Sequence, residues 1–154
     1  MRGLSAFLAL AILFPLDRAD AQGSAAPSAG LGKRRLFIDP SSTSVKLGRA
    51  SLIVTPLAPR ANTYVGDYRL KVVPYFFKSE KGPLLLAAPQ DSYRRLVEGM
   101  AVEFTGVATN QKNGKIKVVT GKITPSTNDR GQVTFSVATD NGELVFNTCY
   151  HLAP

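Results

Sequence analysis

Residues 101–123 read AVEFTGVATNQKNGKIKVVTGKI, and this stretch decides the fold class. Val102 and Phe104 alternate with polar neighbours, a period of two that is typical of a half-buried strand. Asn113–Gly114 then gives a strong tight-turn signal, and the chain returns over residues 115–123. The stretch therefore predicts an antiparallel β-hairpin.

The same pattern continues on both sides of this hairpin. Turn residues at 128–131 (NDRG) and 140–142 (DNG) predict a second hairpin, with strands over 132–139 and 143–152. Upstream, the pattern predicts three strands, over 51–57, 67–77 and 83–88, with a polar hairpin loop at 78–82. Residues 36–38 are a further candidate for a short first strand. Pro74 cannot donate to a strand ladder, so we expect a bulge or a bend there.

One short helix is expected between these two groups of strands. Asp91 can accept hydrogen bonds from the free amides of a first turn. Tyr93, Leu96 and Val97 would then share one face, and Gly99 can supply a left-handed end. A helix of about two turns does not stand alone, so we expect it to pack on the sheet.

These elements predict an all-β domain, an antiparallel β-sandwich or small β-barrel of about seven strands with one short helix. An oligonucleotide/oligosaccharide-binding barrel with an extra C-terminal hairpin is the alternative. Such a barrel resembles the expected order because its helix also lies between strands three and four. That resemblance is topological, and no residue motif carries it.

The N-terminus has the three zones of a secretory signal peptide. Arg2 is followed by the uncharged apolar run 4–16, and Ala19–Asp20–Ala21 presents small residues at a cleavage site. A helix over 4–16 would rise about 20 Å, too short for a hydrocarbon core of about 30 Å. We therefore predict a signal peptide at 1–21, a flexible leader at 22–35, a single β-rich domain at 36–154, and no transmembrane anchor after cleavage.

Charge and cysteine content narrow the compartment and the partner. The chain has 19 Lys and Arg against 11 Asp and Glu, a formal net charge of +8, all of it beyond the predicted signal peptide. Its one cysteine excludes an intrachain disulfide, and it has no Asn-X-Ser/Thr triplet. Both absences fit an exported bacterial protein, periplasmic or extracellular, better than a secreted eukaryotic one.

Basic residues cluster on several of the predicted elements. Like charges on one face repel one another, so the clusters indicate an anionic partner such as an envelope polymer, a lipid headgroup or an acidic protein. Export separates the chain from the cell's nucleic acid, so we do not expect a nucleic-acid partner. The alternative interpretation is a solvated lysine-rich face. The candidate binding residues are Arg69 and Lys71, Arg94 and Arg95 on the helix, and Lys112, Lys115, Lys117 and Lys122 of the central hairpin, with Lys115 and Lys117 expected on one strand face.

Catalytic and metal sites have weaker support. Asn147, Cys149 and His151 share a face of one predicted strand, which is the arrangement of a thiol nucleophile beside a base, but a small buried thiol is the commoner role. One Cys and one His fall short of a zinc site, and Asp129, Asp140 and Glu143 lie in or beside turns. Glu98 and Glu103 could form a carboxylate pair, but a solvated surface explains them better. We expect no catalytic residue, metal or cofactor.

The densest aromatic run is Tyr75–Phe77. Neighbours in a strand point to opposite faces, so we expect at least one ring to leave the main core.

The leading hypothesis is an exported non-enzymatic module with a basic contact face. The alternatives are a small thiol enzyme using Cys149 and His151, and an interaction or inhibitor module that binds through a strand edge. The oligomeric state stays open.

Overall fold

The computed structural model describes residues 34–154, which form ten β-strands, one α-helix and one 3-10 helix. The elements in chain order are β1 (Arg35–Ile38), β2 (Ser41–Val45), β3 (Gly48–Val54), β4 (Ala58–Arg60), β5 (Thr63–Val73), η1 (Phe76–Lys78), β6 (Glu80–Ala87), α1 (Ser92–Val97), β7 (Val102–Thr109), β8 (Ile116–Pro125), β9 (Arg130–Thr139) and β10 (Gly142–Ala153).

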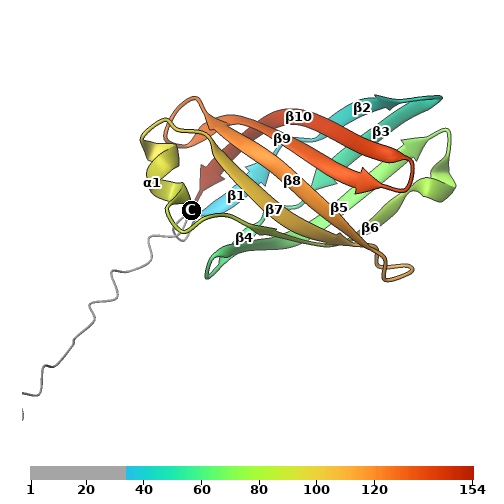
Figure 1. The fold of residues 1–154 in the computed structure, drawn as a ribbon, viewed down its shortest axis with the longest axis horizontal. Coiled ribbons are helices and arrows are strands. Elements are labelled where there is room, and N and C mark those ends of the chain that lie inside the picture. The colour runs from blue at the N-terminus through green and yellow to red at the C-terminus, as the bar shows by residue number, and fades with distance from the viewer. Residues whose placement is uncertain (1–33) are drawn as a thin grey trace, which may run out of the picture.

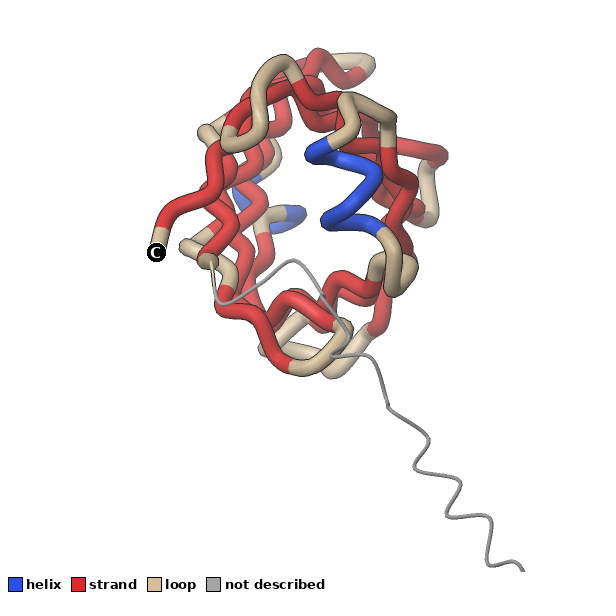
Figure 2. The backbone as a smooth tube through the Cα atoms, turned by 90° about the vertical axis from the view of Figure 1, so that its left-hand side faces the viewer, coloured by secondary structure: helices blue, strands red, loops and turns tan. Residues whose placement is uncertain are grey.

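All ten strands belong to one antiparallel sheet, ordered β1-β10-β9-β8-β7-β6-β5-β3-β2, with β4 beside β5. Only Asp39 and Pro40 separate β1 from β2, so the sheet curls until its two ends meet. The Asp39 amide donates to the Cys149 carbonyl at 3.0 Å, and Leu36 and Leu57 exchange main-chain hydrogen bonds of 3.0 and 2.9 Å. The resulting ring of strands, the barrel, is seen along its length in Figure 1 and from its end in Figure 2. The all-β prediction is confirmed.

The strand count of about seven was wrong, since the described residues form ten. Polar β2 (SSTSV) and the three-residue β4 have no apolar alternation to reveal them. The loop expected at 78–82 also lies earlier, because β5 ends at Val73, before Pro74, and β6 already begins at Glu80. The helix follows six strands rather than three, so the alternative of an oligonucleotide/oligosaccharide-binding barrel does not describe this sheet.

The barrel interior is packed with aliphatic and aromatic side chains. The alternation expected for 102–109 and 132–139 is observed, and it sends Val102, Phe104 and Phe135 inward. The Phe104 and Phe135 rings meet edge to face with centroids 5.2 Å apart. An interior cavity beside Phe135 has a volume of about 20 Å³, room for about one water molecule. This part of the interior does not hold a larger ligand.

Helix α1 lies at one end of the barrel, which we call the helix end (Figure 1). Leu96 and Ser92 are buried there, at 2% and 1% exposure. Gly99 ends the helix region with φ of +77°, as expected. Asp91 is the N-cap residue, but its side chain makes no capping hydrogen bond, so that expectation was wrong. Packing of Leu96, rather than the cap, holds this short helix.

The described residues begin with Arg34, which forms an ion pair with Asp129, and strand β1 begins at Arg35, next to the expected domain start at residue 36. The predicted signal peptide and the rest of the leader lie outside the described residues. Within 34–154, no helix has the length and apolar character needed to cross a membrane.

Candidate binding surface

Four connections between strands gather at the barrel end opposite α1, which we call the loop end (Figure 1). They are Lys46–Leu47, residues 74–79, residues 110–115 and Asp140–Asn141. Several contacts join them. Gly48 packs so closely against β5 that an added Cβ would lie 1.9 Å from the Val73 carbonyl oxygen. The Gln111 amide donates to the Lys81 carbonyl at 2.9 Å, and Lys115 Nζ lies 3.7 Å from Asp140 Oδ2.

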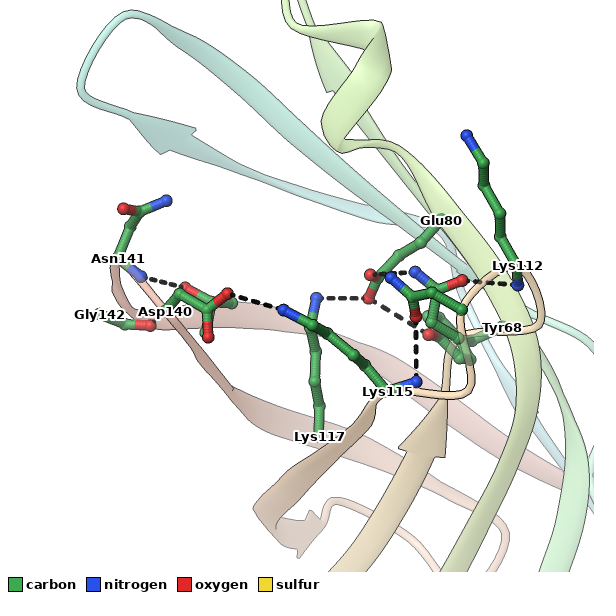
Figure 3. A network of polar contacts seen from close by, with 11 residues as sticks. Tyr68, Glu80, Lys112, Lys115, Lys117, Asp140, Asn141 and Gly142 are labelled. Atoms are coloured by element: carbon green, nitrogen blue, oxygen red, sulfur yellow. Dashed lines mark hydrogen bonds and ion pairs between the residues drawn. The ribbon is translucent and has the colours of Figure 1, made fainter.

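The loop end is built over a buried carboxylate, Glu80, whose side chain is only 7% exposed. Lys117 Nζ donates to Glu80 Oε1 at 2.6 Å, and the Tyr68 hydroxyl donates to the same oxygen at 3.2 Å. Asn110 Nδ2 donates to the other oxygen at 3.0 Å. These contacts reach Glu80 of β6 from two other strands, β5 and β8, and from the loop after β7, and Figure 3 shows Lys117 and Tyr68 beside Glu80. Because both carboxylate oxygens are satisfied, the buried charge is tolerated.

This network affects the neighbouring phenol. Burial and the adjacent negative charge of Glu80, to which the hydroxyl donates, raise the pKa of Tyr68 well above its ordinary value. Tyr68 therefore stays protonated at physiological pH and keeps its hydrogen bond. With a lysine, an amide and a neutral phenol around it, Glu80 has a structural role, joining β5, β6 and β8.

Lys117 differs from the sequence expectation. It points into the barrel with its side chain only 20% exposed, whereas Lys115 precedes β8 and reaches outward to Asp140. The two therefore do not share a strand face. Figure 3 shows Lys117 reaching Glu80 and Lys112 pointing away from that network. Of the predicted hairpin lysines, Lys112 and Lys115 remain on the surface of the loop end.

The loop end has more positive charge than its carboxylates compensate. Among the described residues of its loops and adjoining strand ends there are three carboxylates. Glu80 and Asp140 are engaged by Lys117 and Lys115, and Glu143 at the start of β10 accepts a hydrogen bond from the Ser136 hydroxyl. Three further lysines here have no carboxylate within ion-pair distance in the described part of the chain: Lys46, Lys78 and Lys112. We call these three the loop-end lysines. Only Lys112 was a candidate from the sequence.

The basic surface continues onto the outer wall of the barrel. Arg69 and Lys71 point outward from β5, as expected, and Arg69 lies directly opposite exposed Lys81 of β6. Like charges at directly opposed positions of an antiparallel pair are destabilising. An anionic partner would relieve this repulsion.

The other predicted basic residues lie away from the loop end. Arg94 pairs with Glu98 at 3.9 Å, and Arg95 donates to the Ala101 carbonyl at 3.2 Å, both at the helix end. Lys122 is exposed on β8, opposite Glu103 on β7. The eight candidates therefore do not form one patch.

Lys122 and Glu103 line a shallow groove of about 640 Å³ on the outer wall, together with the hydroxyl residues Thr105, Thr120 and Thr134. Among the groove's lining residues, Glu103 provides the one carboxylate, and Glu98 is bound to Arg94. The groove therefore lacks the pair of acids that glycoside cleavage needs.

Cys149 is exposed on the outer face of β10, contrary to the buried role that a lone cysteine usually has. His151 follows on the same face, where its ring stacks on Phe37 with centroids 4.7 Å apart and an 8° angle between planes. Neither residue lines the groove or the interior cavity. No group of three His, Cys, Asp or Glu side chains within 34–154 could hold a metal ion.

The aromatic run Tyr75–Phe77 lies at the loop end. Phe76 and Phe77 are 69% and 80% exposed, so two rings leave the core. Tyr75 packs against the core and meets Phe77 edge to face, with centroids 5.8 Å apart.

Sequence reasoning missed Lys46, Lys78 and Glu80. The strand alternation could have predicted the inward position of Glu80, because Glu80 lies an even number of residues from buried Leu84 and Leu86. Comparison of the chain with protein-family models, curated proteins and solved structures finds no match.

Proposed function

We propose that this domain is a non-enzymatic binding module that attaches to an anionic partner through the loop end of its barrel. The observation that carries the proposal is the group of loop-end lysines without carboxylate partners, continued by the opposed Arg69 and Lys81. The packed interior beside Phe135 supports surface binding rather than enclosure of a ligand.

The proposed attraction is mainly electrostatic. Exposed charges are screened over about 8 Å at physiological ionic strength, so binding is expected to weaken steeply as salt is added. Part of the same proposal is export of the chain, with residues 1–21 as its signal peptide and the periplasm or the exterior of the cell as its location. Export is tested by N-terminal sequencing of the secreted protein, which is expected to begin at Gln22.

Retention on immobilised dextran sulfate, a defined soluble polyanion, tests the binding. The triple variant Lys46→Gln, Lys78→Gln and Lys112→Gln is expected to bind about ten-fold more weakly at low salt, because each exposed charge contact contributes roughly 0.5 kcal/mol. Arg35→Gln, Arg60→Gln and Arg94→Gln together remove the same charge elsewhere and form the matched control.

Near-wild-type binding by this control, with loss in the lysine variant, supports the loop end. Equal weakening in both would show that only net charge matters. Absence of binding by the wild-type protein at low salt would refute the proposed function.

A further inference from the structure

The connection between β5 and β6 displays apolar side chains rather than burying them. Phe76 and Phe77 are 69% and 80% exposed, and Leu47 is 72% exposed on the β2–β3 turn, next to Gly48, whose backbone lies against Val73 and Pro74 at the start of this connection. We call Phe76, Phe77 and Leu47 the apolar tip. Large apolar side chains grouped in this way on a protein surface mark an interaction site.

The tip is built into the local structure. The Lys78 amide donates to the Tyr75 carbonyl at 2.9 Å, and the Ser79 amide donates to the Phe76 carbonyl at 3.0 Å. The Ser79 hydroxyl accepts the Val72 amide at 3.0 Å, and half-buried Tyr75 packs against the core. These contacts hold η1 so that Phe76 and Phe77 face away from the barrel.

Cations flank the apolar tip on each side. Lys46 precedes Leu47, Lys78 follows Phe77 and lies 5.7 Å from the centroid of the Tyr75 ring, and Lys112 is on the neighbouring loop. Aromatic rings between lysines match the boundary of a membrane, where rings lie at headgroup level and cations attract anionic lipid. A second copy of this chain would bring the same uncompensated lysines together, and their repulsion disfavours it.

We propose that the apolar tip inserts into the surface of an anionic lipid bilayer, with the loop-end lysines bound to lipid phosphates. This inference rests on the proposed function and names the partner of the same surface. In this arrangement the three apolar side chains leave water, and the lysines remain at the level of the headgroups.

The test is co-flotation of the full chain with vesicles of phosphatidylcholine, with or without phosphatidylglycerol. The apolar run 4–16 is present with both kinds of vesicle, so the wild-type protein is expected to float more strongly with phosphatidylglycerol present, and this excess is the quantity measured. Phe76→Ser with Phe77→Ser is expected to weaken vesicle binding at least about ten-fold, since burial of even half of each ring contributes roughly 1 kcal/mol. Every variant keeps residues 1–33, so a difference between variants reports on the tip.

The matched control is Val107→Ser with Val118→Ser, which removes two exposed apolar side chains from the outer wall. It is expected to bind vesicles like the wild-type protein. Binding of the Phe76/Phe77 variant to dextran sulfate is expected to be unchanged, because a soluble polymer gives the rings nothing to enter.

Insertion has a direct spectroscopic readout because the chain contains no tryptophan. Phe77→Trp introduces a single fluorophore at the tip, and its emission is expected to shift to shorter wavelength on phosphatidylglycerol vesicles. Val118→Trp, on the wall, is expected to show no shift.

The outcomes separate the two proposals. Wild-type binding to dextran sulfate without binding to vesicles would overturn the lipid inference and leave the proposed function standing. Binding to neither would overturn both. Unchanged vesicle binding by the Phe76/Phe77 variant, or bound protein without an emission shift in Phe77→Trp, would also overturn insertion of the tip.

Discussion

The two ends of the barrel differ in how their charges are paired and in how far their apolar side chains are exposed. At the helix end, Leu96 is buried under α1, Arg94 is paired with Glu98, and Arg34 is paired with Asp129. At the loop end, a carboxylate is buried and two phenylalanine rings are exposed among uncompensated lysines. The helix end also exposes apolar side chains, but Val97 and Met100 are 42% and 43% exposed, less than the two rings of the loop end. A buried carboxylate, strongly exposed rings and unpaired lysines occur together at the loop end, and such departures from the usual pattern are where a contact surface is expected.

The largest effect is expected from breaking the buried pair under the loop end. Glu80→Leu leaves Lys117, only 20% exposed, without its carboxylate and should destabilise the fold by about 3–5 kcal/mol. Lys117→Met added to Glu80→Leu removes the orphaned charge and should recover most of that loss. Urea denaturation of both variants measures the difference. If Glu80→Leu alone were as stable as the double variant, the unpaired Lys117 would not destabilise the fold.

At the helix end, the corresponding change removes apolar packing. Leu96 is 2% exposed, and Leu96→Ala should cost about 3 kcal/mol through lost burial and a residual cavity. Retention on dextran sulfate, measured well below the unfolding transition, should stay at the wild-type level because α1 is at the opposite end. A parallel loss of binding would mean that the two ends are coupled.

Removal of the hydroxyl group from two buried tyrosines is expected to change stability by smaller amounts and in opposite directions. The Tyr68 hydroxyl donates to Glu80, whereas the Tyr150 hydroxyl is buried with no hydrogen-bond partner in the described structure. Tyr68→Phe should therefore lower stability by about 1 kcal/mol, and Tyr150→Phe should be neutral or raise it by about 1 kcal/mol. The midpoints of urea denaturation, compared between variants of equal m-value, measure these two changes in stability. Destabilisation by Tyr150→Phe would reveal a partner for that hydroxyl, such as a buried water molecule.

Much of the barrel could be predicted because alternation is local. One buried face makes residues such as Val133, Phe135 and Val137 recur with period two, and Gly99 and Gly142, both at positive φ, mark chain reversals. Strand β2 has no such signal. Its position depends on closure of the sheet, which brings together residues more than one hundred positions apart, such as Ser41 and Asn147.

The loop-end surface was only partly predictable, because it too depends on contacts between residues that are far apart in the sequence. The inward position of Lys117 follows from its parity with buried Val119 and Ile123, but its partner Glu80 lies 37 positions away and depends on the register of β6, β7 and β8. The exposure of both Phe76 and Phe77 arises because η1 replaces the strand after Pro74, and alternation no longer applies.

Alkaline pH should weaken the fold through its buried phenols. Burial raises the pKa of Tyr64 to about 12, and the pKa of Tyr68 is also raised, against an ordinary value of 10.0. A folded-state pKa above the unfolded value means that the protonated form is favoured by folding. This stabilisation is full below pH 10 and is lost as the pH rises from there through the folded-state values. Unfolding followed across this range should show the decline, and Tyr68→Phe should make it shallower.

The smallest effect is expected at Cys149, on the wall between the two ends. Its side chain is exposed and lines neither the groove nor the interior cavity, so Cys149→Ser should change stability by less than about 0.5 kcal/mol and leave binding to dextran sulfate unchanged. The native thiol should react with an alkylating reagent because its side chain is exposed. The informative measurement is the alkylation rate of the wild-type protein and of His151→Gln, because a thiol activated by His151 would react more slowly in that variant. A slower reaction would favour the thiol-enzyme alternative over a binding module, and an unchanged rate would leave the loop end as the surface on which function depends.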